Sequence, residues 1–202
     1  MLLTVLESVA RAVTWYSSGR PSETEPDVCA SRDVFQARLD GHLRQLVGGG
    51  WPSDEAALLT AVLGEVGNNC FDHNLGQWAD LPGCWFGREP DAHPPLFWLL
   101  DRGVGILATL RRADSTLITP QQAVDAAFQR VLSGRAPERR GNGLKFVRSV
   151  VNGYDGRGLV CRSGGGQVRF GGLAGALAEV EARLASVDAA GVAVFLVWRL
   201  TP

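Results

Sequence analysis

The apolar run at residues 96–100 constrains the fold of this chain more than any other feature. Two prolines precede the run, and it contains two aromatic side chains. A short apolar segment between turn residues is typical of a buried β-strand. The strand ends at Asp101, and Gly103 and Gly105 follow. Glycine has no Cβ, so this end of the strand suits a ligand that approaches the backbone closely. The alternative is a turn capped by the Asp101 side chain.

Helical and strand patterns alternate along the rest of the chain, which predicts an α/β protein. Apolar spacing predicts helices at residues 2–16, 32–47, 54–73, 119–132, 144–151 and 173–187. Strands are expected at residues 84–86, 96–101, 158–162, 167–171 and 192–200. The helix at 119–132 begins with Thr119, Pro120 and Gln122, which form the pattern of a capping box with proline at the first helical position.

The overall composition excludes several classes of protein. The formal net charge of −1 provides no general basic surface for a nucleic-acid backbone. No apolar run approaches the ~18 residues that a membrane span needs. The four cysteines have no metal-ligand spacing, and Cys70 and Cys161 lie in apolar patterns typical of buried, reduced thiols. We therefore expect a cytoplasmic protein without a membrane or nucleic-acid partner.

A first polar motif consists of Glu65, Asn69 and His73. Steps of four residues keep these side chains on one stripe of the predicted helix 54–73. Leu58 and Val62 continue the stripe as apolar residues, which suggests that the polar part faces a lined cavity. A carboxylate at Glu65 can orient or deprotonate a water, and an amide oxygen at Asn69 can bind Mg²⁺. The alternative is a solvated helix face.

Two further motifs suit a phosphate-bearing ligand with an amino group. Asp101 can accept a hydrogen bond from an exocyclic amine such as that of adenine. Gly141, Asn142 and Gly143 precede the predicted helix 144–151, and a helix N-terminus with free N–H groups binds anions. Arg140 would add positive charge near a terminal phosphate. The alternative is a plain loop that leads into a helix.

Together the three motifs resemble those of the GHKL, or Bergerat-fold, ATP-binding superfamily, which includes sensor histidine kinases, DNA gyrase and anti-sigma serine kinases. The similarity covers roughly residues 52–202, and the motifs occur in the family's order. The matching residues are Glu65, Asn69 and His73 for the N box, Asp101, Gly103 and Gly105 for the first glycine box, and Gly141, Gly143 and Leu144 for the second.

The resemblance implies a role for each matching position. Asn69 would hold Mg²⁺, and Glu65 would act on the attacking water or hydroxyl. Asp101 would recognise the adenine amine, while Gly141 and Gly143 would let backbone amides reach the phosphates. The implied cofactors are therefore ATP and Mg²⁺.

The implied fold is a two-layer α/β sandwich in which helices cover one face of a mixed sheet. Residues 51–202 would form the ATP-binding domain, and residues 1–50 an N-terminal helical extension that dimerises, covers the sheet or docks a partner. Residues 106–140 would form a lid that closes over the nucleotide.

The implied function is ATP hydrolysis or γ-phosphoryl transfer to a protein partner, in the style of the anti-sigma kinases. Two features depart from sensor kinases, namely Asp72 before His73 and Lys145 in the second glycine box. His42 lacks the acidic residue that follows a phosphoacceptor histidine. Two alternatives remain open: an ATP-dependent protein-interaction switch, and a histidine-kinase-type domain acting on a separate phosphoacceptor.

Overall fold

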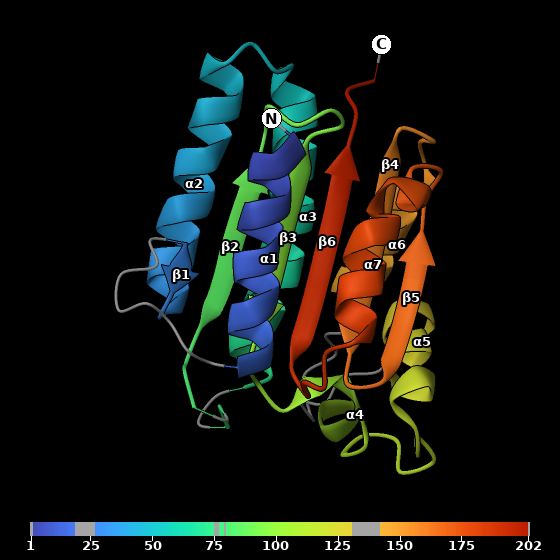
Figure 1. Ribbon diagram of the computed structural model, residues 1–202. Helices are drawn as coiled ribbons and strands as arrows, with labels where there is room; N and C mark the ends of the chain where they lie inside the picture. The colour runs from blue at the N-terminus through green and yellow to red at the C-terminus, as the bar shows by residue number, and fades with distance from the viewer. Residues whose placement is uncertain (1, 19–26, 75–76, 79, 131–141, 202) are drawn as a thin grey trace.

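A six-stranded β-sheet forms the centre of the molecule (Figure 1). The computed structural model describes residues 2–18, 27–74, 77–78, 80–130 and 142–201. The strands are, in chain order, β1 (Val28–Cys29), β2 (Cys84–Glu89), β3 (Leu96–Asp101), β4 (Arg157–Ser163), β5 (Gly166–Phe170) and β6 (Val192–Trp198). Their order across the sheet is β1-β2-β3-β6-β4-β5, so the last strand of the chain lies in the middle.

The strand directions correct one expectation from the sequence. Every pairing in the sheet is antiparallel, so the predicted mixed sheet is wrong. A parallel neighbour needs a crossover connection, whereas β2 with β3 and β4 with β5 are consecutive antiparallel pairs. β6 then lies antiparallel to both β3 and β4, with Leu96 opposite Val197 and Leu159 opposite Leu196.

Two separate cores lie on the two faces of the sheet. The larger core is covered by α2 (Arg32–Gly48), α3 (Ser53–Asp72), α5 (Pro120–Gln129) and α6 (Gly143–Asn152). The second core is covered by α1 (Leu2–Ser18), η1 (Ala174–Leu177) and α7 (Ala178–Ala185) (Figure 1).

The central strand β3 shows why both faces are covered. Phe97 and Leu99 point into the larger core, while Trp98 and Leu100 point into the second. Since neighbouring side chains of a strand point to opposite faces, a strand that is apolar at every position must be buried on both sides. The expectation of helices on one face only is therefore wrong.

Most of the predicted elements are confirmed, with shifted ends. α5 has the expected capping box. The Thr119 hydroxyl oxygen accepts from the backbone N–H of Gln122, and the side-chain oxygen of Gln122 accepts from the backbone N–H of Thr119. The predicted helix at 173–187 is divided into η1 and α7. A short helix, α4 (Gly105–Leu110), lies where the sequence supported no element. The cysteines are buried free thiols, as expected for Cys70 and Cys161.

The first helices contribute to both cores. α1 buries Val9, Trp15 and Tyr16 in the second core, whereas α2 buries Phe35 and Leu39 in the larger one. α1 thus covers the sheet, one of the roles considered for residues 1–50. The domain boundary near residue 50 stays a prediction. Within the described ranges, no helix is long and apolar enough to cross a bilayer.

Candidate functional site

A cavity of about 510 Å³ opens between α3, the end of β3, α4 and the start of α6. Its lining includes the polar stripe of α3, namely Glu65, Asn69 and His73. Glu65 is exposed at the cavity, while Asn69 and His73 are half-buried. The four-residue spacing brings Glu65 and Asn69 to one face of α3, and His73, the C-cap residue of this helix, lines the same cavity. The larger core holds α3 against the sheet.

Asp101 lies at the buried end of this cavity, where β3 stops. Its side chain is 1% exposed, and its Oδ1 accepts three hydrogen bonds. The donors are the Gly103 amide at 2.8 Å, Nδ2 of Asn74 at 3.2 Å and the Val192 amide at 3.4 Å. The Cys70 thiol also lies against the carboxylate. The carboxylate is thus held by neutral donors alone in the part of the chain that the structure describes.

Burial without a cation changes the acidity of Asp101. Desolvation raises the pKa of its carboxyl from 3.8 to about 6, and the hydrogen bonds from Gly103, Val192, Cys70 and Asn74 oppose part of this rise. A carboxyl group that lies in a cavity and has a pKa raised by burial is a typical candidate for a functional group. Asp101 is therefore a strong acceptor aimed at a site that a ligand can enter.

The two glycines after Asp101 lie where a side chain would collide with other parts of the protein. A Cβ on Gly103 would lie 1.9 Å from Oδ1 of Asn74. Gly105 has a φ of +80°, and its Cβ would lie 2.1 Å from the Ala190 carbonyl oxygen. Gly103 thus makes room for Asn74, which lines the cavity, and Gly105 for the Ala190 carbonyl. Of the two, only Gly105 lines the cavity itself.

The third motif lies beside the first at the cavity. Asn142, Gly143 and Leu144 line it at the start of α6. A Cβ on Gly143 would lie 2.1 Å from Oε2 of Glu65, so only glycine leaves the carboxylate its present position. The structure therefore brings Glu65 to the helix N-terminus that the sequence marked as an anion site.

Part of the expected site lies outside the described residues, namely Arg140 and Gly141. Within the expected lid at 106–140, the structure contains most of α4 and the whole of α5, which packs on the larger core through the buried Val124 and Phe128. Residues 131–140 lie outside the described residues, and closure over a nucleotide stays a prediction.

Asn74 and Ser163 were missed by the sequence analysis. The Asn74 side chain is 3% exposed and joins the end of α3 to the loop after β3. Ser163 is buried, accepts from the Ile106 amide at 3.0 Å and donates to the Ala190 carbonyl. An asparagine just beyond a helix is a common sign of the helix end. The chain order does not reveal which loop its side chain would meet.

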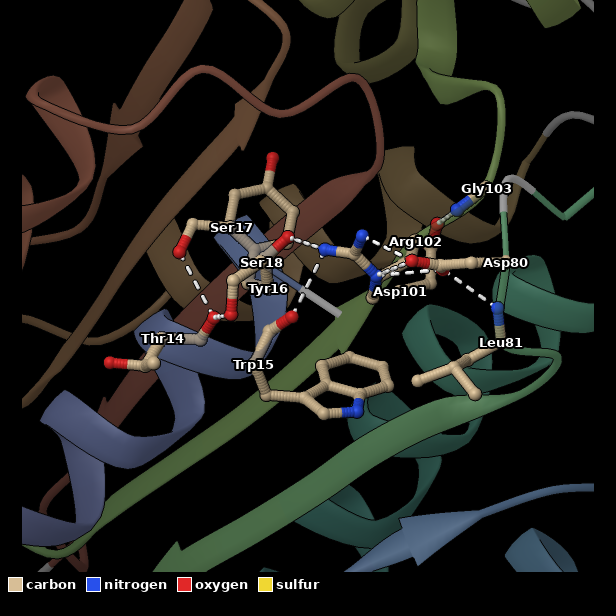
Figure 2. A network of polar contacts seen from close by, with 10 residues as sticks. All are labelled: Thr14, Trp15, Tyr16, Ser17, Ser18, Asp80, Leu81, Asp101, Arg102 and Gly103. Atoms are coloured by element: carbon tan, nitrogen blue, oxygen red, sulfur yellow. Dashed lines mark hydrogen bonds and ion pairs between the residues drawn. The ribbon is translucent and has the colours of Figure 1, made fainter. Parts of the chain in front are cut away.

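Arg102 fixes the loop after β3 to α1 (Figure 2). Its Nη1 donates to the carbonyl oxygens of Trp15 and Tyr16, which belong to the last turn of α1. Its Nε and Nη2 donate to Asp80, at 2.9 Å and 2.6 Å to the nearer oxygens. The guanidinium thus satisfies carbonyls that a helix end leaves without partners. The hydroxyl of Tyr16 donates to Gly191, next to Val192.

His42 is no accessible phosphoacceptor. It is 1% exposed and packs between the rings of Phe86 and Phe97. Burial lowers the pKa of His42 to about 4, so the imidazole is neutral at physiological pH. This agrees with the expectation from its sequence context.

The cavity contains no self-sufficient metal centre among the residues described. No group of three or more His, Cys, Asp or Glu side chains there is arranged to hold a metal ion. Asn69 lines the cavity with an amide oxygen, which suits a magnesium ion whose other ligands are phosphate oxygens and waters. The donor set therefore fits a metal that arrives with a phosphate ligand.

Comparison with protein-family models and with curated proteins finds no match to this chain.

Proposed function

We propose that this protein binds Mg-ATP in the cavity between α3, β3 and α6, and hydrolyses it or transfers its γ-phosphoryl group to a protein partner. One observation supports this proposal above the others. Three segments far apart in the sequence line one cavity of about 510 Å³, within the usual size of small-molecule sites of roughly 300–1,000 Å³. They contribute Glu65 and Asn69, Asp101 and Gly105, and Asn142 to Leu144.

The chemistry of these groups divides the ligand into three parts. The buried Asp101 accepts from the amino group of the base, and the apolar lining around it, with Leu99 and Val194, suits a flat ring. The N-terminus of α6 receives the phosphates, where the backbone N–H groups favour negative charge. Asn69 would be a protein ligand of Mg²⁺, which would neutralise charge on the phosphates. The Bergerat fold is part of the same proposal.

The binding step is tested by calorimetric titration of the whole chain with Mg-ATP. We expect saturable binding by the wild type and a loss of at least about 100-fold in affinity for Asp101→Asn, because the acceptor becomes a donor. Arg183→Gln, on the far helix α7, is the control and should bind as the wild type does. Absence of binding by the wild type would refute the proposal.

Glu65 tests the chemical step after nucleotide binding. Its carboxylate lies beside Gly143 at the cavity, where it can orient an attacking water or hydroxyl. Glu65→Gln should leave Mg-ATP affinity within about twofold and lower phosphate release by at least about 100-fold. If the wild type binds Mg-ATP without turnover, alone or with captured partners, the result would support an ATP-dependent interaction switch and contradict the enzyme proposal.

A further inference from the structure

Asn74 controls how Asp101 is presented to the cavity. Its Nδ2 donates to the Cys70 carbonyl at 2.8 Å and to Oδ1 of Asp101 at 3.2 Å, while its Oδ1 accepts from the Val104 amide at 3.0 Å. A backbone carbonyl can only accept, and a backbone amide can only donate. These two contacts therefore fix the orientation of the Asn74 amide, which can offer Asp101 only a donor.

The same logic fixes which oxygen of Asp101 faces the cavity. The hydrogen bonds to Asp101 from Asn74, Gly103 and Val192 all end on Oδ1. All three donors are unable to accept, so the atom at this position must be an acceptor. None of these three donors reaches Oδ2, which leaves that oxygen for a ligand. The Asp101 carboxylate therefore cannot rotate freely, and an entering ligand meets an acceptor with a fixed orientation.

We infer that Asn74 is a positioning residue that holds Oδ1 of Asp101 and so makes the site select a base with an amino group over one with a carbonyl at the same place. This inference rests on the proposed nucleotide site. Gly103 is part of the arrangement, because any Cβ there would collide with the Asn74 amide. Asn74 acts through Asp101 and needs no contact with the ligand.

The test uses two nucleotides that differ at this one group. ATP has an amino group on the six-membered ring of its base, and ITP has a carbonyl there. Calorimetry at one pH gives the ratio of their affinities for the wild type, Asn74→Leu and Asn74→Ala. Both variants remove the donor to Asp101, because neither new side chain carries a polar atom. We expect the wild type to prefer ATP by about tenfold or more, and both variants to lose most of this preference.

Asn152→Leu is the matched control for Asn74→Leu. Asn152 also ends a helix and accepts from a backbone amide, that of Gly171 at 3.0 Å, but it does not line the cavity. The ratio of ATP affinity to ITP affinity of this control variant should equal that of the wild type. Equal weakening of both nucleotides by the Asn74 variants, with the ratio kept, would mean a merely structural role and would overturn the inference.

A third variant keeps the test decisive if the Asn74 variants do not fold. In Asp101→Asn the carboxamide oxygen must occupy the Oδ1 position, because three donors point there. The NH₂ group then faces the cavity, so the ratio should invert and ITP should bind more tightly than ATP. An uninverted ratio refutes the inferred geometry. Absence of any nucleotide binding by the wild type refutes the proposed function itself, which is a distinguishable result.

Discussion

Two buried carboxylates, Glu55 and Asp101, lie near opposite ends of α3, and their surroundings differ completely. Glu55 is 7% exposed and is surrounded by donors. It accepts from Arg157 at 3.1 Å, from the Trp198 indole at 2.9 Å and from Thr201 at 2.6 Å. Arg157 itself stacks on the Trp198 ring at 4.1 Å. The charge of Glu55 is therefore neutralised within the protein.

Asp101 has no such compensation. Its described partners are neutral groups, and its pKa is raised to about 6 by burial. A buried charge is costly unless it is paired, so evolution of a stable core would favour the arrangement around Glu55. A buried carboxylate that has no charged partner and lies beside a cavity is a candidate ligand-binding group. The comparison thus favours a structural role for Glu55 and makes Asp101 the carboxylate to test for function.

The largest expected effect on stability comes from breaking the paired site. Glu55→Ala should lower the free energy of unfolding by about 3–5 kcal/mol, because Arg157 would remain buried without its counter-ion. Denaturant unfolding of the whole chain measures this. Glu179→Ala removes the partner of Arg183 in an exposed pair on α7 and should change stability very little. Similar losses for both variants would mean that burial of the pair is unimportant.

The unpaired site should respond in the opposite direction. Asp101→Asn removes a charge that the fold holds at a cost, while the carboxamide oxygen keeps the contacts of Oδ1. We expect the free energy of unfolding at pH 7 to rise on the order of 2 kcal/mol, together with the loss of ATP affinity. Thermal unfolding without nucleotide is the measurement. A lower Tm for Asp101→Asn would show that the carboxylate is a stabilising group after all.

The pH dependence gives a smaller and more specific effect. The folded pKa of Asp101, about 6, lies above its ordinary value of 3.8, so the folded state binds the proton more tightly. The contribution of this group to stability therefore increases as pH falls from about 7 toward 4. His42 acts oppositely, since its folded pKa of about 4 lies below the ordinary 6.5 and protonation favours unfolding.

A comparison of the wild type with Asp101→Asn separates the pH dependence due to Asp101 from that due to His42. Both the wild type and Asp101→Asn contain His42, so its contribution cancels. The stability advantage of Asp101→Asn should shrink by roughly half between pH 7 and about pH 5. Denaturant unfolding at several pH values measures the gap. A constant gap would contradict a raised pKa for Asp101.

The comparison also marks what the sequence could predict about the fold. Helices and strands follow from local periodicity and turn chemistry, as the capping box at Thr119 demonstrates. The second helical layer was also encoded, because a strand that is apolar throughout residues 96–100 requires cover on both faces. The expectation of helices on one face came from the family resemblance and did not take account of the apolar pattern at residues 96–100. The antiparallel direction of β6 depends on contacts across the whole chain, which no local pattern encodes.

The candidate site was predictable in its parts more than in its connections. Spacing put Glu65, Asn69 and His73 on one helix face, and all three line the cavity. Asp101 stood out as a carboxylate that ends an apolar strand. The partners that distinguish Asp101 from Glu55 come from elsewhere, since Asn74 is 27 residues away and Val192 is 91 residues away. Such contacts follow from the folded topology alone.

Gly143→Ala should have the smallest effect on stability and still change the site. The added Cβ would meet Oε2 of Glu65 at 2.1 Å, and this oxygen is the end of a flexible, exposed side chain that can move aside. The free energy of unfolding should therefore change by less than about 1 kcal/mol.

Displacing the Glu65 carboxylate from the start of α6 should lower phosphate release at least about tenfold, with Mg-ATP affinity affected less. Gly175→Ala, where the Cβ has no neighbour within 4 Å, is the matched control. Unchanged turnover in Gly143→Ala would mean that the position of Glu65 is irrelevant to the reaction, leaving Asp101 as the functional carboxylate of a site that only binds.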